Sequence, residues 1–249
     1  MTFSETARAA FRRGDDDLVA RLARDEAERA RAAGDDPTLV EALYLTSRLA
    51  VRAGDLDEAA RVASDALAVA VGTGDRALEE RPRHVLAGVT RMAGDLGRAR
   101  VLYQESIDLN TELGDDRTVT SEVHNLAFTE LGLGETAAAR DRFAASRARI
   151  VAGAYRDLVP YAYVGAAAVA VADGDHARAA RLAGLARRAF AELGQVPDPD
   201  DAAELAAVDA AVLGELGAEA VDAGRQEGAG LDPWTVLVDA AGRGAEPGA

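Results

Sequence analysis

The chain has no cysteine and no lysine among its 249 residues. Without cysteine, neither a disulfide framework nor a thiolate metal site is possible, and an intracellular setting is the default. Without lysine, all 28 basic residues are arginine, and a phosphate-binding loop that ends in Gly-Lys-Ser/Thr cannot form. These absences exclude a disulfide-stapled secreted domain and a P-loop nucleotidase.

Aromatic side chains make up only 4% of the chain, while the apolar fraction is 49% and contains much alanine. Small side chains let helices approach closely, so this apolar content is sufficient for a core of packed helices. No apolar run reaches the roughly 18 residues of a membrane-spanning helix, and the first residues do not form a signal peptide. We therefore expect a soluble, cytoplasmic protein with no membrane partner.

Acidic residues outnumber the arginines and give a formal net charge of -15. Proteins that bind nucleic acid need a basic stripe to neutralise phosphates, so this charge argues against direct nucleic-acid binding. The abundance of Ala, Arg, Gly and Asp is typical of GC-rich bacterial genomes. We interpret it as a sign of bacterial origin rather than of chemistry.

A glycine followed by an acidic or amide residue recurs along the chain every 20 residues, or once after 40. Glycine adopts the left-handed conformation that ends a helix, and aspartate caps the first amides of the next helix. Each pair therefore predicts a joint between two helices, and a fixed period of this kind indicates a solenoid of stacked hairpins. The joints are Gly14-Asp15, Gly34-Asp35, Gly54-Asp55, Gly74-Asp75, Gly94-Asp95, Gly114-Asp115, Gly134-Glu135, Gly174-Asp175 and Gly194-Gln195.

Aligning the hairpins on Gly54, Gly94, Gly134 and Gly174 brings small residues into shared columns. A small residue at a fixed place lets the second helix of a hairpin lie close to the first. The column five residues after the glycine holds Ala59, Ala99, Ala139 and Ala179, and the column nine after it holds Ala63, Tyr103, Phe143 and Ala183. The column twelve after holds Ala66, Ser106, Ser146 and Ala186, and the column seven before holds Ser47, Ala87, Ala127 and Ala167.

These columns resemble the tetratricopeptide repeat (TPR), in which a Gly-Asp turn is followed by Ala, an aromatic residue and Ala at these offsets. The period differs, because the family repeat has about 34 residues and each helix here is expected to be roughly one turn longer. The resemblance implies an all-α fold: a right-handed superhelix (α-solenoid) of antiparallel helix pairs, TPR-like with 40-residue repeats. About five hairpins are expected in residues 1–194, the first of them partial.

After Gly194 the period is lost. Residues 195–200 contain two prolines, an Ala-rich helix is expected from about Asp201 to Leu216, and a short last helix contains Trp234. We expect residues 195–249 to form C-terminal capping helices and a disordered tail, since the ends of solenoids are atypical.

Two C-terminal stretches also resemble the end of the repeat and sensor region in large ATP-dependent LuxR-type actinobacterial regulators. They are Ala-Arg-Leu-Ala-Gly-Leu-Ala-Arg-Arg-Ala-Phe at 180–190 and Leu-Gly-Ala-Glu-Ala-Val-Asp-Ala-Gly-Arg-Gln-Glu-Gly at 216–228. In those regulators the array follows a nucleotide-binding domain and commonly precedes a helix-turn-helix. Neither domain is found in this sequence, so the resemblance implies a sensor-like or scaffold module without ATP hydrolysis or DNA binding.

By the TPR resemblance, the first helix of each hairpin lines a concave groove. Residues two, three, six, ten and thirteen before the turn glycine then face that groove, which mixes arginine, histidine and aromatic side chains. The candidate ligand- or partner-binding residues are Glu41, Tyr44, Arg48, Arg81, His84, Arg91, Ser121, His124, Asn125, Phe128 and Tyr161.

His84 and His124 occupy the same column of successive hairpins, and neighbouring first helices place such positions about 10 Å apart. As neutral imidazoles they suit a ligand-contact or acid–base pair. The alternative is two partly buried histidines that neighbouring carboxylates satisfy. A zinc site is not expected, because it needs three or four close ligands.

Two further features allow two interpretations each. Arg48, Arg81, Arg83 and Arg91 either gather an anionic partner through bidentate hydrogen bonds or pair with Glu41, Glu79, Glu80 and Glu122. Pro160, between Tyr161 and Tyr155, either kinks its helix and opens a pocket or leaves the tyrosines packed in the core. Asn125 either holds an extended peptide backbone or is solvated.

No nucleophile elbow, phosphate loop, paired-carboxylate motif or dinucleotide fingerprint is present in the sequence, so we predict no catalytic residue, metal or cofactor. The first functional hypothesis is a non-enzymatic module that binds a protein or peptide in the concave groove, as a regulator or scaffold. The alternatives are a sensor that responds to a small molecule or peptide and acts on a transcription factor, and an enzyme that uses the groove. A homodimer through the C-terminal helices is also compatible with the sequence.

Overall fold

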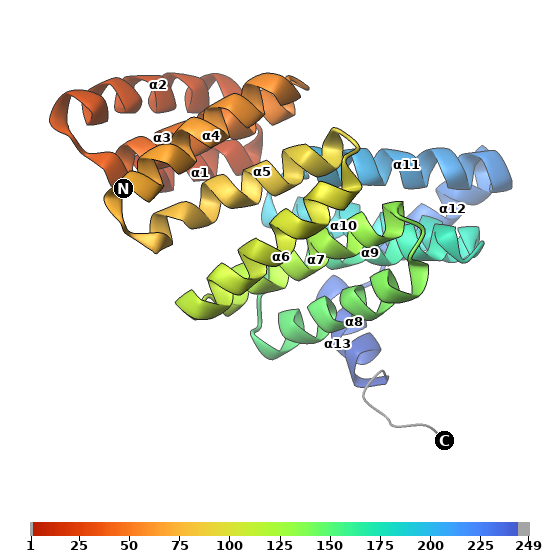
Figure 1. Ribbon diagram of the computed structural model, residues 1–249. Coiled ribbons are helices and arrows are strands. Elements are labelled where there is room, and N and C mark those ends of the chain that lie inside the picture. The colour runs from red at the N-terminus through yellow and green to blue at the C-terminus, as the bar shows by residue number, and fades with distance from the viewer. Residues whose placement is uncertain (1, 244–249) are drawn as a thin grey trace. The chain divides into compact units, whose positions relative to one another are not determined.

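A computed structural model describes residues 2–243, which form α-helices joined by tight turns, with two short 3₁₀ turns and no β-strand in that range (Figure 1). The all-α, solenoid-like fold expected from the sequence is confirmed. The right-handed twist of the array stays a prediction. Among the described residues, no helix combines the length and the apolar character needed to cross a membrane.

The chain divides into two compact units, Met1–Asp115 and Asp116–Ala249, which we call unit 1 and unit 2. In unit 1 each helix packs against the next, so three antiparallel hairpins are stacked in chain order. Its elements are α1 (Phe3–Arg13), α2 (Asp16–Ala33), α3 (Asp36–Arg52), α4 (Leu56–Thr73), the 3₁₀ turn η1 (Arg76–Glu79), α5 (Glu80–Met92) and α6 (Leu96–Leu113).

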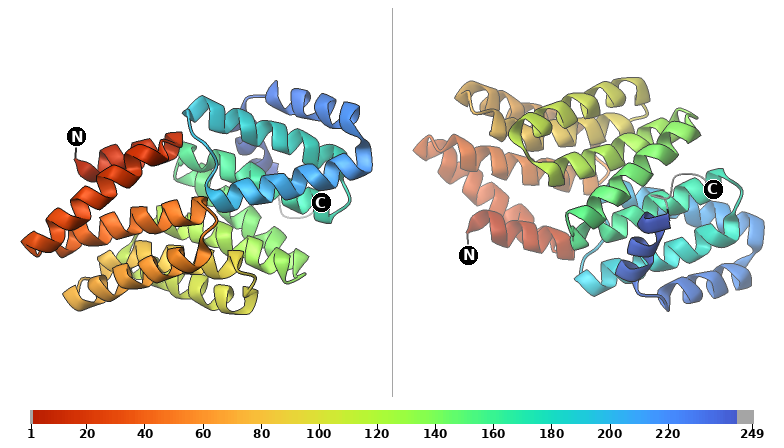
Figure 2. Two further views of the ribbon diagram at one scale, coloured as in Figure 1. Left: turned by 90° about the horizontal axis from the view of Figure 1, so that it is seen from above. Right: turned by 90° about the horizontal axis from the view of Figure 1, so that it is seen from below.

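Unit 2 continues the hairpins and ends in helices that fold back on them. Its elements are α7 (Asp116–Gly132), α8 (Thr136–Ala152), the 3₁₀ turn η2 (Arg156–Leu158), α9 (Val159–Ala172), α10 (His176–Leu193), α11 (Pro199–Leu216), α12 (Ala218–Ala229) and α13 (Pro233–Arg243). α11 packs on α9 and α10, α12 packs on α10, and α13 contacts α8, α9 and α10 (Figure 2). The boundary predicted at residue 194 stays a prediction, and the end of the expected disordered tail, residues 244–249, lies outside the described residues.

The helix joints have the chemistry that the Gly-Asp pairs predict. All nine turn glycines have φ between +60° and +86°, the left-handed region that glycine enters at no steric cost. The aspartates that follow accept a hydrogen bond from the amide three residues later, at 3.0 to 3.3 Å, in five of these joints. Helices of 17 or 18 residues result in α3, α4, α6, α7, α8 and α10, as the period requires.

The structure adds one joint that the glycine pattern does not show. Ala154 lies midway between Gly134 and Gly174, and it is the only described non-glycine residue with positive φ, +51°. Its amide donates to the Val151 carbonyl, as the turn glycines donate to carbonyls at the ends of their own helices. The regular spacing of the joints therefore continues through residue 154, with an alanine in the glycine position.

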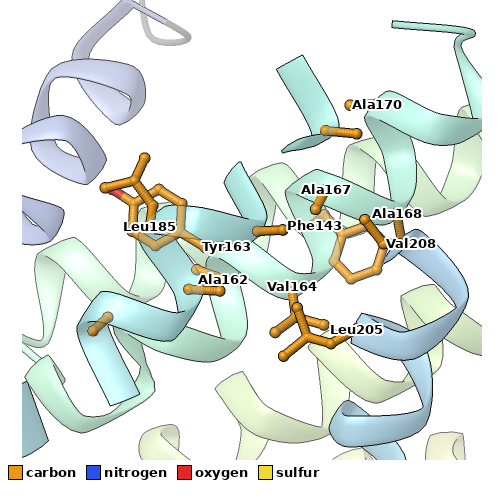
Figure 3. Close-up of a cluster of buried hydrophobic side chains, with 14 of the residues drawn as sticks. Phe143, Ala162, Tyr163, Val164, Ala167, Ala168, Ala170, Leu185, Leu205 and Val208 are labelled. Carbon is orange, nitrogen blue, oxygen red and sulfur yellow. The ribbon is translucent and has the colours of Figure 1, made fainter. Parts of the chain in front are cut away.

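The shared small-residue columns form the core. Every residue of the four columns aligned above is at most 2% exposed, from Ser47 to Ala186. In unit 2, Phe143 of α8 and Tyr163 of α9 belong to one buried cluster with Ala167, Ala168, Leu185 and Val208 (Figure 3). The Ala and Ser positions are buried because these side chains let neighbouring helices close over them, and the space that remains is filled by the rings of Tyr103 and Phe143.

Pro160 does not kink a helix. The chain makes the η2 turn first, α9 begins at Val159, and Pro160 occupies the first helical turn, where a missing amide proton is tolerated. Of the two interpretations of Pro160, the kinked helix is wrong and the packed tyrosines are confirmed, since Tyr163 is buried in the core with Tyr155 and Tyr161 packed against it.

Candidate functional site

In unit 1, arginine and aromatic side chains from the three first helices gather on one face. Phe11 is on α1, Tyr44 and Arg48 are on α3, and Arg81 is on α5. The Arg48 guanidinium lies 4.2 Å from the Phe11 ring centroid and donates a 3.1 Å hydrogen bond to the Tyr44 hydroxyl. The Arg81 guanidinium lies 5.4 Å from the Tyr44 ring centroid, so cations and rings alternate across three helices.

A buried glutamate ties this face together. Glu41 of α3 is 8% exposed and accepts hydrogen bonds from Arg8 of α1, at 2.7 Å, and from Arg81 of α5. We call these three residues the ion triad. Although burial opposes its charge, the pKa of Arg81 is raised above its usual range by Glu41, Tyr44 and Glu80. The triad holds two guanidinium groups around one carboxylate and keeps an excess of positive charge on this face.

We call the whole surface the first-helix face of unit 1. It has a further cation at its edge, because Arg52 lies 3.7 Å from the Phe11 ring centroid and pairs with Asp16. The three first helices carry eight arginines and four acidic residues, whereas α2, α4 and α6 carry seven arginines and eleven acidic residues. The first helices of unit 1 thus carry net positive charge and its second helices net negative charge. The members of the face are Arg8, Phe11, Glu41, Tyr44, Arg48, Arg52 and Arg81.

The structure brings four of the predicted residues together here: Glu41, Tyr44, Arg48 and Arg81. Arg81 pairs with Glu41 and Glu80, and Arg83 pairs with Glu79. That these arginines also gather an anionic partner stays a prediction. His84 is half-buried on α5, and Arg91 is buried near the end of the same helix.

The remaining predicted residues belong to unit 2. His124 of α7 is buried and lies edge-on to the rings of Phe128 and Phe143, with centroids 5.1 and 5.2 Å away. Its Nε2 atom lies 3.8 Å from Asp201 Oδ1 of α11. This is the environment of a core histidine with a carboxylate neighbour. The proximity of His84 and His124 stays a prediction, because the two residues lie in different units.

The three other predicted residues of unit 2 have other neighbours than the rings and the carboxylate around His124. Asn125 is buried, and its backbone carbonyl accepts a hydrogen bond from Thr129. Tyr161 of α9 donates to Asp198 at 3.4 Å and lies edge-on to Phe190. Ser121 is half-buried on α7.

Two important residues of the face were missed by the sequence reasoning, although the signal was present. Arg8 lies six residues before Gly14 and Phe11 three before it, the same columns that hold Arg48 and Val51 in the next hairpin. Extending the columns into the partial first hairpin would have found both. Asp201 carried no such signal, because it follows the point where the period ends.

Comparison with known proteins supports the fold only. No protein-family model matches the chain, and no curated protein sequence matches it. Among solved structures, it is similar to BtubC (BKLC) from P. vanneervenii, with 18% identity and a TM-score of 0.58 over 94% of each chain. The similarity identifies the chain as a helical-repeat protein.

Proposed function

We propose that this protein is a non-enzymatic binding module, TPR-like in its repeat, that holds an acidic peptide segment of another protein on the first-helix face of unit 1. The observation that carries the proposal is the alternation of guanidinium groups and aromatic rings over α1, α3 and α5. Guanidinium groups bind carboxylates through paired hydrogen bonds. The half-buried Tyr44 ring provides apolar area for an extended chain, whereas Phe11 is buried and supports the guanidinium groups of Arg48 and Arg52 from below. A protein that binds a peptide segment without transforming it acts as a regulator or a scaffold.

The charge distribution favours an acidic segment over a neutral one. The protein as a whole is strongly acidic, so it repels acidic chains except where its arginines are concentrated. The ion triad is pre-organised by the buried Glu41, which lowers the entropic cost of holding Arg8 and Arg81 in place. Both arginine side chains remain about one-third exposed, at 37% and 31%.

The test is selection of acidic peptides from a displayed library, followed by fluorescence polarisation with the purified protein. The variant Arg8→Gln/Glu41→Gln/Arg81→Gln removes the whole ion triad, so that no buried charge is left without a partner. We expect it to weaken peptide affinity by roughly tenfold or more, since two charge-assisted contacts are lost. Wild-type affinity should also fall as salt is raised.

The matched control is Glu58→Gln/Arg61→Gln/Asp65→Asn, which neutralises a triad on the second helix α4. It should leave affinity unchanged. Equal weakening in both variants, or undiminished binding in the first, would show that the assigned face is wrong. A small-molecule adduct retained in native mass spectrometry of protein from its own host, with no acidic peptide selected, would support the sensor hypothesis instead.

A further inference from the structure

The joint between α11 and α12 consists of one residue. Gly217 separates the two helices and supplies no side-chain cap to α12. Its φ of +77° and ψ of +164° lie in a region of backbone conformation that glycine alone adopts at low cost. The joint therefore has the properties of a hinge, and straightening it would fuse α11 and α12 into one helix over residues 199–229.

Beyond this hinge, α12 lies against α10 with its backbone rather than with large side chains. A Cβ atom at Gly228 of α12 would overlap the Arg181 carbonyl oxygen of α10. In the other direction, a Cβ atom at Gly184 of α10 would overlap the Arg225 carbonyl oxygen of α12. The place that α12 occupies therefore accepts only a helix with glycine at the contact. The α12 helix of a second copy meets this requirement.

Polar contacts at the same place also join α12 to α10. Arg181 of α10 pairs with Glu227 of α12 at 3.2 Å. Arg188 of α10 donates a 2.7 Å hydrogen bond to the Ala229 carbonyl at the end of α12. Both contacts would form again if α12 of a second copy occupied this place, so an exchange of α12 between two copies would conserve them.

A straight helix would also join two stripes of small residues that the bend keeps apart. Small residues recur from α11 into α12 at alternating steps of four and three, the spacing of one face of a packed helix. The α11 half of this stripe is exposed, whereas the α12 half is buried or half-buried on α10. In a straight helix both halves would lie on one face, so one partner would cover both. The members are Ala203, Ala207, Ala210 and Gly214 on α11, Gly217 at the joint, and Val221, Gly224 and Gly228 on α12.

We propose that two copies of this chain form a dimer by exchanging the segment from α12 onward about Gly217, so that α12 of each copy packs on α10 of the other. Exchange about a short hinge is a low-cost route to a dimer, because contacts within one chain are replaced by the same contacts between chains. The exposed alanines of α11 are covered by the second copy in this dimer, which offsets the entropic cost of association. The exchange does not depend on the peptide binding proposed for the first-helix face of unit 1.

The hinge provides the first test. Gly217→Ala strains the bent joint and favours the straight helix, since alanine is the better helix former. We expect the dissociation constant of the dimer, measured by analytical ultracentrifugation, to fall by about tenfold or more, because each dimer contains two hinges. The matched control inserts Gly-Ser-Gly-Ser after Gly217, and this longer joint should favour the closed monomer and raise the constant. A constant that neither variant changes would overturn the proposal, as would a Gly217→Ala protein that stays monomeric.

A cysteine pair shows which copy supplies each α12. The chain has no cysteine, and a Cβ atom at Gly224 would lie 3.0 Å from the Ala180 Cβ atom of α10. Ala180→Cys/Gly224→Cys therefore places two thiols within reach of a disulfide. Monomer and dimer fractions are separated, oxidised and compared on a non-reducing denaturing gel. We expect the disulfide within one chain in the monomer and between two chains in the dimer. A dimer held together with disulfides only inside its chains would have formed without exchange, against the proposal.

A charge exchange tests the same contact without disturbing the helix backbones. Arg181→Glu and Glu227→Arg each place like charges at the exposed pair between α10 and α12, whereas a mixed exchanged dimer restores both pairs. In native mass spectrometry of the two variants together, we expect heterodimers in several-fold excess over random pairing. Arg61→Glu mixed with Glu58→Arg is the control, because that pair lies within α4, and these variants should pair at random. Random pairing of the α10 and α12 variants would contradict the exchange.

Discussion

At the scale of single residues, Ala154 shows what the repeat requires of its joints. A left-handed backbone costs a residue with a Cβ atom about 1–2 kcal/mol, and every comparable turn in the chain uses glycine instead. The backbone of residue 154 is held in this conformation by the helices on either side. The regular spacing of the joints therefore determines the conformation more strongly than the residue does.

Ala154→Gly is expected to raise the free energy of unfolding by up to about 1 kcal/mol. The gain is the relief of left-handed strain, reduced by the extra backbone freedom of glycine in the unfolded chain. Urea unfolding followed by circular dichroism measures it. The reverse change at an equivalent joint, Gly134→Ala, should destabilise, and a loss of stability in Ala154→Gly would contradict the strain argument.

The buried hydroxyl of Tyr163 makes the free energy of unfolding depend on pH. Burial, followed by the negative charge of Asp232, raises the pKa of its hydroxyl above its ordinary value near 10. Stability from the neutral, hydrogen-bonded hydroxyl is therefore fully present below pH 10 and is lost as the pH rises above it. Tyr163→Phe should be less stable than wild type by about 1–3 kcal/mol at pH 7, because the Pro233 carbonyl loses its donor.

The difference in stability between wild type and Tyr163→Phe should narrow between pH 10 and 11. Unfolding of both proteins in urea at pH 7, 10 and 11 gives this difference directly. The titration of the other tyrosines contributes equally to both proteins and cancels in the difference. A difference that stays constant over this range would mean that the hydroxyl does not titrate as its surroundings require.

At the scale of elements, the helix caps and the small-residue columns could be predicted from the sequence. The start of α9 and part of the first-helix face could not. Gly-Asp pairs act on their own neighbours in the chain, so the sequence displays them directly. The η2 turn and the start of α9 at Val159 carry no such local signal, so the sequence leaves open whether Pro160 lies inside a helix or in its first turn. The first-helix face of unit 1 was predicted in part, because Arg8 and Phe11 lie in a hairpin that is incomplete.

Gly165 sets how closely α9 approaches its neighbours. A Cβ atom there would lie 2.4 Å from Phe143 Cε1 and 3.0 Å from His124 Cε1, both in the buried aromatic cluster. Gly165→Ala is expected to destabilise unit 2 by about 1–3 kcal/mol through overpacking. Gly214→Ala on α11 is the control, since a Cβ atom there meets nothing within 4 Å and should stabilise the helix by a few tenths to about 1 kcal/mol. Chemical denaturation that ranks both variants equally would contradict the packing argument.

At the scale of the whole molecule, each unit has its own core. The apolar clusters of unit 1 contain residues up to Val89, and the cluster of unit 2 contains residues from Ala127 to Leu237. An uninterrupted repeat predicted one array over residues 1–194, and nothing in its period marks the division after Asp115. The helix caps depend only on residues close in the sequence, so they recur whether or not successive hairpins share one core. The sequence period therefore carries no information about where one compact unit ends and the next begins.

The regular joint also governs how such a chain can change its length. Since the turn glycines from Gly14 to Gly194 share one left-handed conformation, removing or duplicating one whole hairpin between equivalent glycines keeps that conformation at the new joint. An insertion of a single residue inside a helix instead rotates all that follows by about 100° and turns the small-residue column out of the core. Gene duplication and deletion in units of one hairpin are thus the length changes that this architecture tolerates.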